Sequence, residues 1–498
     1  MEDRYIVAID LGTTKIALAV AIVNGRDKRL VYYKETPLQA GAMRSSRIHN
    51  ESKVAAGLRQ AIGDAEEILG VKITGAVVGL PRYYVRTEEN SASNPSLNPD
   101  ECITEENVAE LKAFAQDNYP LDDPEHDAVY GAVAQSFSTD EEFQVIESDV
   151  VGMSGKNLSG NFKIFIGNRT AADKIDRAMR QSGVSAVKKC FVPLLTADAT
   201  LTPLEIDNGV ALIDFGGGCT SLSIYYKDVL RYYSSIPFGG WNVTNDIHIE
   251  SNIPFSLAEN IKLAFGACMP DRLQNLGEKQ LLLKKSNGDA DRRLAVSYLS
   301  EIITAREEEI IRAMLYEIGR SRYADKLGSG VVVTGGGAQM TNLANFITEL
   351  SGYNVRVGRP HLNGVSDECT GVNTPSATTA IGLVLAGAGE PNLSCALSGE
   401  AAALSAQGQN AACSEAPAAD PTPTEDEQRA GVLPGLLDEE EVSEKRKAEE
   451  EKKRKKEEKV KKTYNFKWGF LNHIEKGTNK VGSIVEGGLD KLVNKIGE

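Results

Sequence analysis

The feature that most constrains this chain is a short pattern that occurs twice. The pattern consists of an apolar run ending in Asp, a glycine-containing turn and a second run of strand-forming residues. It occurs around DLGTTK at residues 10–15 and again around DFGGGCT at residues 214–220. A repeat of this kind indicates two structural units built in the same way. We therefore expect two similar halves that face one ligand.

The first of the two turns is suited to phosphate. Gly12 lets the backbone approach a ligand closely, while Thr13 and Thr14 offer hydroxyls and amide donors for phosphate oxygens. The run IALAVAIV that follows is rich in strand-forming residues, so the turn belongs to a β-hairpin. A P-loop and a dinucleotide-binding fingerprint are excluded, because the glycine loop of each opens a helix.

An aspartate stands at the same place in both copies of the pattern. Asp10 and Asp214 each end a buried strand, where an unpaired carboxylate costs several kcal/mol unless a cation or hydrogen-bond donors meet it. Magnesium on nucleotide phosphates would supply that cation. The alternative for each residue taken singly is an ordinary turn aspartate at a strand end.

A third glycine-rich element could hold the rest of a nucleotide. The run VVVTGGGAQ ends a strand at Thr334, and Gly335, Gly336 and Gly337 lead toward a helix expected to begin near Thr341. Glu259 and Lys262 stand three residues apart on a second expected helix, so they could reach ribose hydroxyls and the base edge together. The alternative for this pair is a solvated ion pair.

Charge and composition limit the partners and the compartment. The formal net charge of −15 over 498 residues disfavours nucleic acid, which needs a basic surface. The seven cysteines include no C-x-x-C, which disfavours disulfides and zinc and fits a reducing cytosol. The sequence begins MEDRYIVAID, unlike a secretory signal, and contains no run of about 18 apolar residues that could span a bilayer.

The chain changes character after about residue 387. Alternating strand and helix runs before that point predict an α/β body. Residues 388–444 are rich in Ala, Ser, Gly, Pro and acidic residues, which predicts a disordered linker. Residues 445–462 carry charges of both signs at helical spacing and predict a solvated helix, with a simple spacer as the alternative.

Apolar residues return in the final segment, 463–498. The spacing of the apolar residues predicts an amphipathic helix from Phe466 to Ile496, broken near Gly477, that lies in a membrane interface. The basic excess of residues 445–462 would attract anionic headgroups. A coiled coil, or a helix docked on the body, is the alternative. The side chains expected to contact the membrane are Phe466, Trp468, Phe470, Ile484, Val485, Leu489, Leu492 and Ile496.

These elements, in this order, resemble the superfamily of actin, heat-shock chaperones and sugar kinases, and within it the FtsA family of bacterial cell-division proteins. The resemblance covers roughly residues 4–387 and rests on DLGTTKIALAV, PLLTADATLT, DFGGGCTSLSIY, SSIPFGGWNVTNDI, AENIKLAFGAC, VVVTGGGAQMTNL and SATTAIGLVLAG. It implies an actin-like two-lobed ATPase fold. The first lobe would be residues 1–207, interrupted by a division-specific subdomain at 82–166. The second lobe would be 208–367, with an outer subdomain at 241–303, and residues 368–387 would return to the first lobe.

The resemblance also implies the roles of the site residues. ATP and Mg²⁺ are the expected cofactors. Asp10 and Asp214 would hold magnesium through water, and adenosine would lie against Gly335, Gly336, Gly337, Glu259 and Lys262. The terminal phosphates would lie among Gly12, Thr13, Thr14, Lys15, Gly216, Gly217 and Gly218. Chaperone relatives carry an acid before the proline of the first connecting segment, but here Val192 precedes Pro193, so at most slow ATP hydrolysis is expected.

In cellular terms, the resemblance implies a peripheral protein on the cytoplasmic face of the bacterial inner membrane, at the division septum. It would form actin-like protofilaments with itself, bind other division proteins, and tether the tubulin-like protein FtsZ to the membrane. Contacts to the acidic FtsZ tail are expected from Arg292, Arg293 and Arg306, with ordinary surface arginines as the alternative. The competing functions are a carbohydrate kinase, which shares DLGTT and the hairpin, and a chaperone ATPase, which would need a peptide-binding domain after residue 388.

Overall fold

A computed structural model of the chain describes residues 3–25, 27–94, 102–283, 292–361, 365–367, 369 and 371–398. The predicted charged helix at 445–462, the membrane-binding tail and all of the linker beyond residue 398 lie outside the described residues. Within the described residues, no helix is both long enough and apolar enough to cross a membrane.

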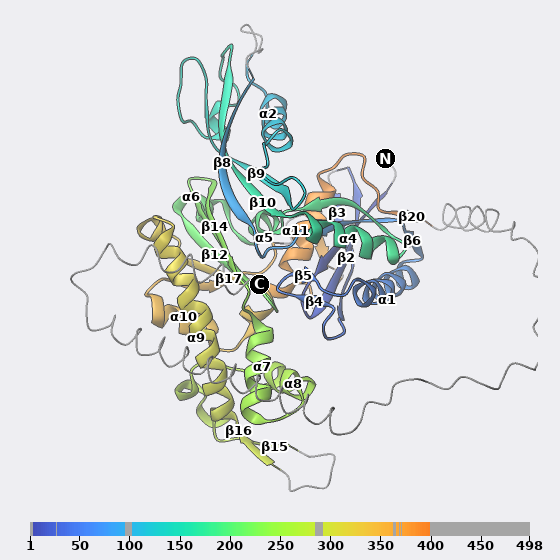
Figure 1. The fold of residues 1–498 in the computed structure, drawn as a ribbon, viewed down its shortest axis with the longest axis vertical. Coiled ribbons are helices and arrows are strands. Elements are labelled where there is room, and N and C mark those ends of the chain that lie inside the picture. The colour runs from blue at the N-terminus through green and yellow to red at the C-terminus, as the bar shows by residue number, and fades with distance from the viewer. Residues whose placement is uncertain are drawn as a thin grey trace, which may run out of the picture. The chain divides into compact units, whose positions relative to one another are not determined.

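Two mixed sheets form the centre of the fold and repeat one topology (Figure 1). In the first, β1 pairs antiparallel with β2 and parallel with β7; in the second, β12 pairs antiparallel with β13 and parallel with β17. The first sheet has the order β11-β7-β1-β2-β3-β19, with bounds Ser185–Cys190, Gly75–Gly79, Arg4–Leu11, Lys15–Asn24, Asp27–Pro37 and Val365–Asp367. The second has the order β14-β13-β12-β17-β18, with bounds Val229–Ile236, Thr220–Tyr226, Val210–Phe215, Val331–Thr334 and Val355–Val357. The prediction of an α/β, actin-like fold is confirmed.

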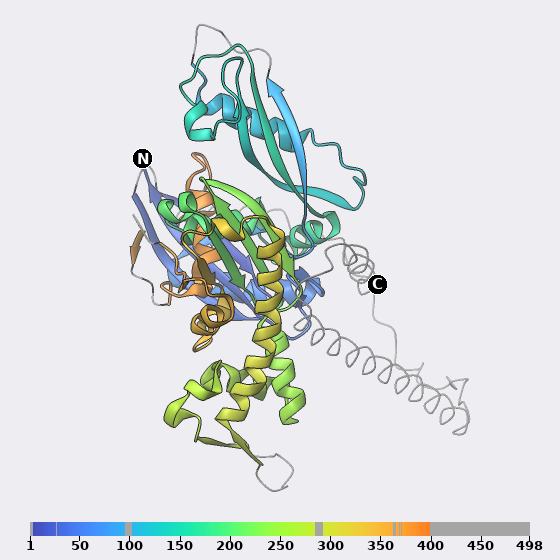
Figure 2. The same ribbon diagram turned by 90° about the vertical axis from the view of Figure 1, so that its left-hand side faces the viewer.

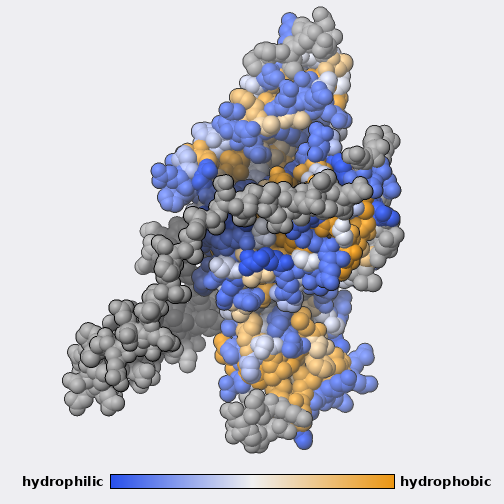
Figure 3. Space-filling view, turned by 90° about the vertical axis from the view of Figure 1, so that its right-hand side faces the viewer, coloured by the Kyte–Doolittle hydropathy of each residue, from blue (hydrophilic) through white to orange (hydrophobic). Residues whose placement is uncertain are grey.

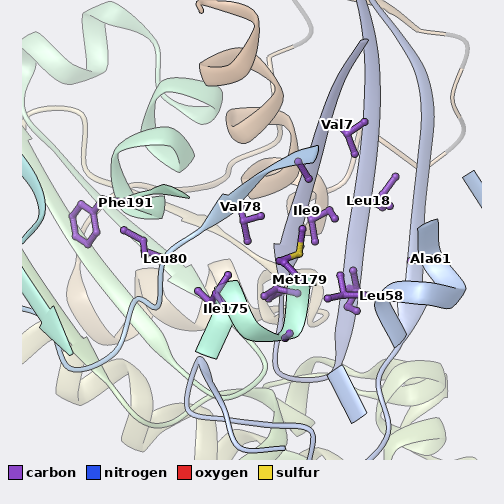
Figure 4. Packing of buried hydrophobic residues seen from close by; sticks show 14 of the residues in the cluster. Val7, Ile9, Leu18, Leu58, Ala61, Val78, Leu80, Ile175, Met179 and Phe191 are labelled. Carbon is purple, nitrogen blue, oxygen red and sulfur yellow. The ribbon is translucent and has the colours of Figure 1, made fainter. Parts of the chain in front are cut away.

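Helices cover both faces of the first sheet because its central strands are apolar on both sides. Along β1, Val7 and Ile9 face α1 (Glu51–Leu69) and α4 (Arg169–Gln181), as Figure 4 shows. Ala8 faces the opposite way and joins a cluster with α11 (Thr378–Ala388). This alternation follows from the two-residue period of a strand, and burial on both faces explains why β1 and β2 appear as continuous apolar runs in the sequence.

Three long helices extend from the second sheet toward one end of the described body (Figure 1). They are α7 (Gly240–Ser251), α8 (Phe255–Phe265) and α9 (Val296–Arg320), and they adjoin a hairpin of β15 (Gln280–Leu283) and β16 (Arg292–Ala295). Further helices beside the two central sheets are α5 (Val192–Thr200), α6 (Pro203–Asn208) and α10 (Leu343–Ser351). Short 3₁₀ helices lie at Pro270–Arg272, Gln274–Leu276, Ala324–Lys326, Gly336–Gln339 (η4) and Pro375–Ala377. The helix expected near Thr341 thus begins two residues later, at Leu343, after the turn of η4.

A separate three-stranded sheet lies beyond the opposite end of the central sheets, as Figure 2 shows. Its order is β8-β10-β9, with both pairs antiparallel, and its core includes Phe137, Phe162 and Leu111. The helix expected from ITEENVAELKAFAQ is α2, which begins after a capping box at Thr104. The bounds of this part, in chain order, are Arg86–Asn94 for β8, Glu105–Asp117 for α2, Asp127–Ser138 for β9, Glu147–Val150 for α3 and Leu158–Asn168 for β10.

The chain does not leave the body at residue 388, where the predicted linker starts. Strand β20 (Ala396–Ser398) pairs antiparallel with β6 (Val71–Ile73), and the amide of Cys395 donates to the carbonyl of Tyr5 at 2.7 Å. Cys395 is fully buried. The linker prediction is therefore wrong for residues 389–398, because a few apolar residues fix this stretch although its average composition is polar. One further short hairpin, β4 (Met43–Arg44) with β5 (Arg47–Ile48), precedes α1.

Candidate nucleotide site between two equivalent hairpins

The first candidate phosphate loop is the tight turn between β1 and β2. A Cβ at Gly12 would lie 2.8 Å from the carbonyl oxygen of Lys15, so only glycine fits there. The carbonyl of Thr14 accepts from the amide of Leu38 at 2.9 Å, which anchors the far side of the turn. Thr13 and Thr14 are thereby held at the end of two buried strands.

Lys15 follows this loop and is part of an ion-pair cluster. Its ammonium lies 2.6 Å from Oε2 of Glu35 on β3. Oε1 of Glu35 accepts from the hydroxyls of Tyr33 at 2.7 Å and Ser376 at 2.8 Å. Burial alone would raise the pKa of Glu35, but Lys15 and these hydrogen bonds outweigh it and hold that pKa below its ordinary value. Glu35 and Ser376 thus fix Lys15 beside the loop.

The second candidate phosphate loop, Gly216–Gly218, is supported by a second glycine turn at residues 239–241. The carbonyl of Gly216 accepts from the amide of Gly240 at 3.1 Å, and that of Gly217 accepts from Trp241 at 2.6 Å. A Cβ at Gly239 would lie 2.3 Å from the carbonyl oxygen of Gly216. The supporting turn at 239–241 is missing from the predicted site residues, although the glycine pair in SSIPFGGW is a visible signal for it.

The two loops come into direct contact. A Cβ at Gly218 would lie 2.7 Å from Oγ1 of Thr13, and one at Gly217 would lie 3.2 Å from Cγ2 of Thr14. Residues about two hundred positions apart are thus brought together as the repeat predicts, and glycine is needed because a side chain would separate the loops.

The two strand-end aspartates share a cation that the sequence does not single out. Arg82 donates through Nη1 to Oδ2 of Asp214, and the two side chains are only 13% and 7% exposed. Asp10 is half-buried as a residue but its carboxyl is enclosed, and this burial raises its pKa, while Arg82 opposes that rise. Burial lowers the pKa of Arg82, but Asp214 and Asp10 outweigh it and raise that pKa above its ordinary value. Arg82 was missed because 132 positions separate it from Asp214 and no local motif marks it.

The third glycine element lies beside Asp214. Strands β12 and β17 pair Asp214 with Thr334, so the next residue, Gly335, reaches the carboxyl. Gly335 has a φ of +85°, and a Cβ there would lie 2.3 Å from Oδ1 of Asp214. At Gly336, by contrast, no described atom lies within 4 Å of the Cβ position. Gly337 again packs closely, with its Cβ position 2.9 Å from Cβ of Phe215.

Glu259 and Lys262 lie together on α8, as their spacing predicts. The ammonium of Lys262 is 2.9 Å from Oε2 of Glu259. It also donates to Oγ1 of Thr244 at 2.8 Å and to the carbonyl of Gly240 at 3.1 Å. The side chain of Lys262 is only 10% exposed, so the alternative of a solvated pair does not describe it. Through Gly240, this pair is connected to the second phosphate loop.

The three candidate partner arginines differ in their surroundings. Arg293 is exposed on β16, whereas nothing is described of the side chain of Arg292. Arg306 is only 20% exposed and forms ion pairs with Asp246 and Glu309, both at 2.5 Å. An acidic partner that binds Arg306 would have to compete with the carboxylates of Asp246 and Glu309.

Two topologically equivalent sheets, each with a strand-end aspartate and a hairpin loop directed at the other, define the actin-like class of protein. A chain of a "PilM-PilN type IV pilus biogenesis complex" shares this fold, with a TM-score of 0.52, 16% identity and coverage of 78% of this chain and 99% of that one.

The model of the cell division protein FtsA family matches residues 211–382. A cell division protein FtsA of Neisseria meningitidis serogroup B is 30% identical over 387 residues, covering 77% of this chain and 90% of its own length. One of Pseudomonas aeruginosa is 28% identical over 392 residues, covering 78% and 90%. The chain belongs to the FtsA family of cell-division proteins.

Proposed function

We propose that the chain binds ATP with magnesium between the two hairpins and assembles, in that state, at the membrane of the division site. The observation that carries the proposal is the close approach of two equivalent glycine loops beside Asp10 and Asp214, since a Cβ built at Gly218 would lie 2.7 Å from Oγ1 of Thr13. One such loop is common, but two that face each other at equivalent strand ends can bind a polyphosphate from both sides.

The residues present fit ATP and magnesium in their chemistry. Magnesium prefers oxygen ligands and retains several waters, so Asp10 and Asp214 would hold it through water. Backbone amides and hydroxyls of Gly12, Thr13, Thr14 and of Gly216–Gly218 would bind phosphate oxygens, together with Lys15. The open space at the Cβ position of Gly336 suits a flat ligand on that loop, so Gly335–Gly337, with Glu259 and Lys262, would hold adenosine.

Slow hydrolysis is part of the proposal. Val192 begins α5 and is 2% exposed, and it offers no base to an attacking water. ATP would therefore act mainly by favouring one conformation of the two lobes, and thereby polymerisation.

The membrane and FtsZ complete the proposed role. The amphipathic tail at 463–498 would anchor the protein peripherally, and the outer subdomain near α7, α8 and β16 would receive the FtsZ tail. Figure 3 supports a docking surface there, because apolar surface gathers over this end of the body. Its large exposed apolar side chains include Trp241, Ile249 and Leu263. Other division proteins would bind the same membrane-bound polymer.

The partner contact can be tested with a peptide of the FtsZ tail. Arg292→Glu with Arg293→Glu should weaken binding, because both charges then repel an acidic peptide. Arg306→Gln should weaken it less, since Arg306 is already paired with Asp246 and Glu309. A scrambled peptide is the control, and unchanged affinity in the double variant would refute this docking surface.

Nucleotide binding is tested by isothermal titration of MgATP together with a phosphate-release assay. The full chain should bind and turn over slowly. Asp214→Ala should abolish binding, whereas Asp271→Ala, at an exposed aspartate of the same lobe, should not. Brisk phosphate release without a partner would contradict the proposed slow hydrolysis. Phosphoryl transfer to glycerol, xylulose or gluconate in a coupled assay would favour a carbohydrate kinase instead.

A further inference from the structure

Arg82 is not among the expected site residues, although it contacts one of them, Asp214. It follows β7, which ends at Gly79 in the first lobe, and precedes β8, which begins at Arg86 in the three-stranded sheet. Its guanidinium reaches Asp214 of the second lobe. Arg82 therefore lies where the chain passes from the first lobe to the three-stranded sheet, and its side chain connects this point to the second lobe.

The backbone of Arg82 is fixed on both sides. Its amide donates to Oγ of Ser46 at 3.1 Å, and its carbonyl accepts from the hydroxyl of Tyr233 at 2.5 Å. A Cβ at Gly216 would lie 2.6 Å from the carbonyl oxygen of Cys219 and 2.9 Å from Nη2 of Arg82, so the turn itself requires glycine and the guanidinium packs against it. Arg82 thus lies directly against the second phosphate loop.

The partner of the Arg82 carbonyl is also part of an aromatic cluster. Tyr233 packs edge-on against Phe165 of β10, at 5.9 Å between ring centroids, and against Phe191 at 5.3 Å. Phe165 and Phe191 stack at 4.6 Å. A shift of the Arg82 backbone would therefore reach β10 through Tyr233 and β8 through the chain itself, because close-packed interiors transmit displacement.

We propose that Arg82 is a nucleotide-sensing residue, which exchanges Asp214 for the terminal phosphate of a bound nucleotide and so repositions the three-stranded sheet. This inference rests on the proposed function, because it needs magnesium nucleotide at this site. The planar guanidinium of an arginine can form charge-assisted hydrogen bonds to a phosphate with the same donors that it uses for a carboxylate. A buried guanidinium without a partner anion is strongly unfavourable, so Arg82 can leave Asp214 only for another anion such as a phosphate.

The experiment measures binding and conformation separately in the full-length protein. MgATP and MgADP are titrated into wild type, Arg82→Gln and Arg86→Gln, and hydrogen exchange is followed for residues 86–94 and 158–168. Arg86 is the matched control, because it pairs with Glu88 and Asp127 within the three-stranded sheet. Wild type should show a nucleotide-dependent change of exchange in these two strands.

In Arg82→Gln, affinity for MgATP should fall about tenfold or more while that for MgADP changes little, as expected when one charge-assisted contact to the terminal phosphate is lost. The exchange response should disappear as well, whereas Arg86→Gln should keep the affinity of wild type. MgATP binding by wild type without any exchange response in β8 and β10 would overturn the inference, even if Arg82→Gln fails to fold. Failure of wild type to bind MgATP would instead refute the proposed function.

Discussion

At the scale of single residues, the site depends on which glycines have room for a side chain, and Gly335 and Gly336 form a matched pair. Gly335→Ala should destabilise the fold by about 1–3 kcal/mol, because its φ of +85° is strained for alanine and its Cβ would meet Asp214. Gly336→Ala should stay within about 0.5 kcal/mol of wild type. Thermal unfolding measures both.

A second substitution in the same loop tests nucleotide binding independently of folding. Gly336→Asp places a negative charge in open space next to the proposed adenosine site, so it should abolish MgATP binding while leaving the folded state intact. A variant that folds and binds like wild type would argue against adenosine at Gly336.

Glu307 on α9 predicts a pH-dependent stability. It is 2% exposed, and within the described residues its Oε2 has no hydrogen-bond partner. Burial raises its pKa from 4.5 to about 7, against the opposing effect of Lys262 and Arg306. The protonated carboxyl therefore stabilises the fold fully below pH 4.5, and this stabilisation is lost as the pH rises through about 7.

Glu307→Gln mimics the protonated form. At pH 8 it should raise the free energy of unfolding by at most about 3 kcal/mol, and near pH 4.5 it should change little. Chemical denaturation at the two pH values measures the difference. An equal effect at both would mean that Glu307 titrates normally.

At the scale of elements, the apolar runs ending at Asp10, Asp214 and Thr334 identify β1, β12 and β17, because central strands buried on both faces are apolar throughout. The hairpins follow from the glycine turns. The Arg82–Asp214 pair and the pairing of β20 with β6 could not be predicted, since long-range partners leave no periodicity in the sequence. The turn at Gly239–Gly240 was visible as a motif but had no evident role before its contact with Gly216 was known.

The pairing of β20 with β6 predicts where the folded body ends. A chain truncated after Ser398 should unfold at nearly the same temperature as the full chain. Truncation after Ala388 should lower that temperature, because it removes β20 and the buried Cys395. Differential scanning calorimetry compares them, and equal midpoints would mean that residues 389–398 contribute nothing.

At the scale of the whole molecule, the proposed role needs the tail as well as the body. Full-length protein should sediment with anionic vesicles, whereas truncation after Lys462, or Leu489→Asp with Leu492→Asp, should leave it in solution, because charges on the apolar face oppose insertion. Asn479→Asp with Asn494→Asp adds the same charge to the polar face and should sediment. Sedimentation of the truncated chain would place the anchor elsewhere.

Electron microscopy of the full-length protein on anionic lipid with MgATP tests whether nucleotide-dependent filaments form on the membrane, because it examines nucleotide, membrane and polymer together. Wild type should form protofilaments on the lipid, whereas Asp214→Ala and the chain truncated after Lys462 should form none. Lipid-bound protein that binds MgATP but forms no filaments, or filaments that form equally well with Asp214→Ala, would contradict this prediction.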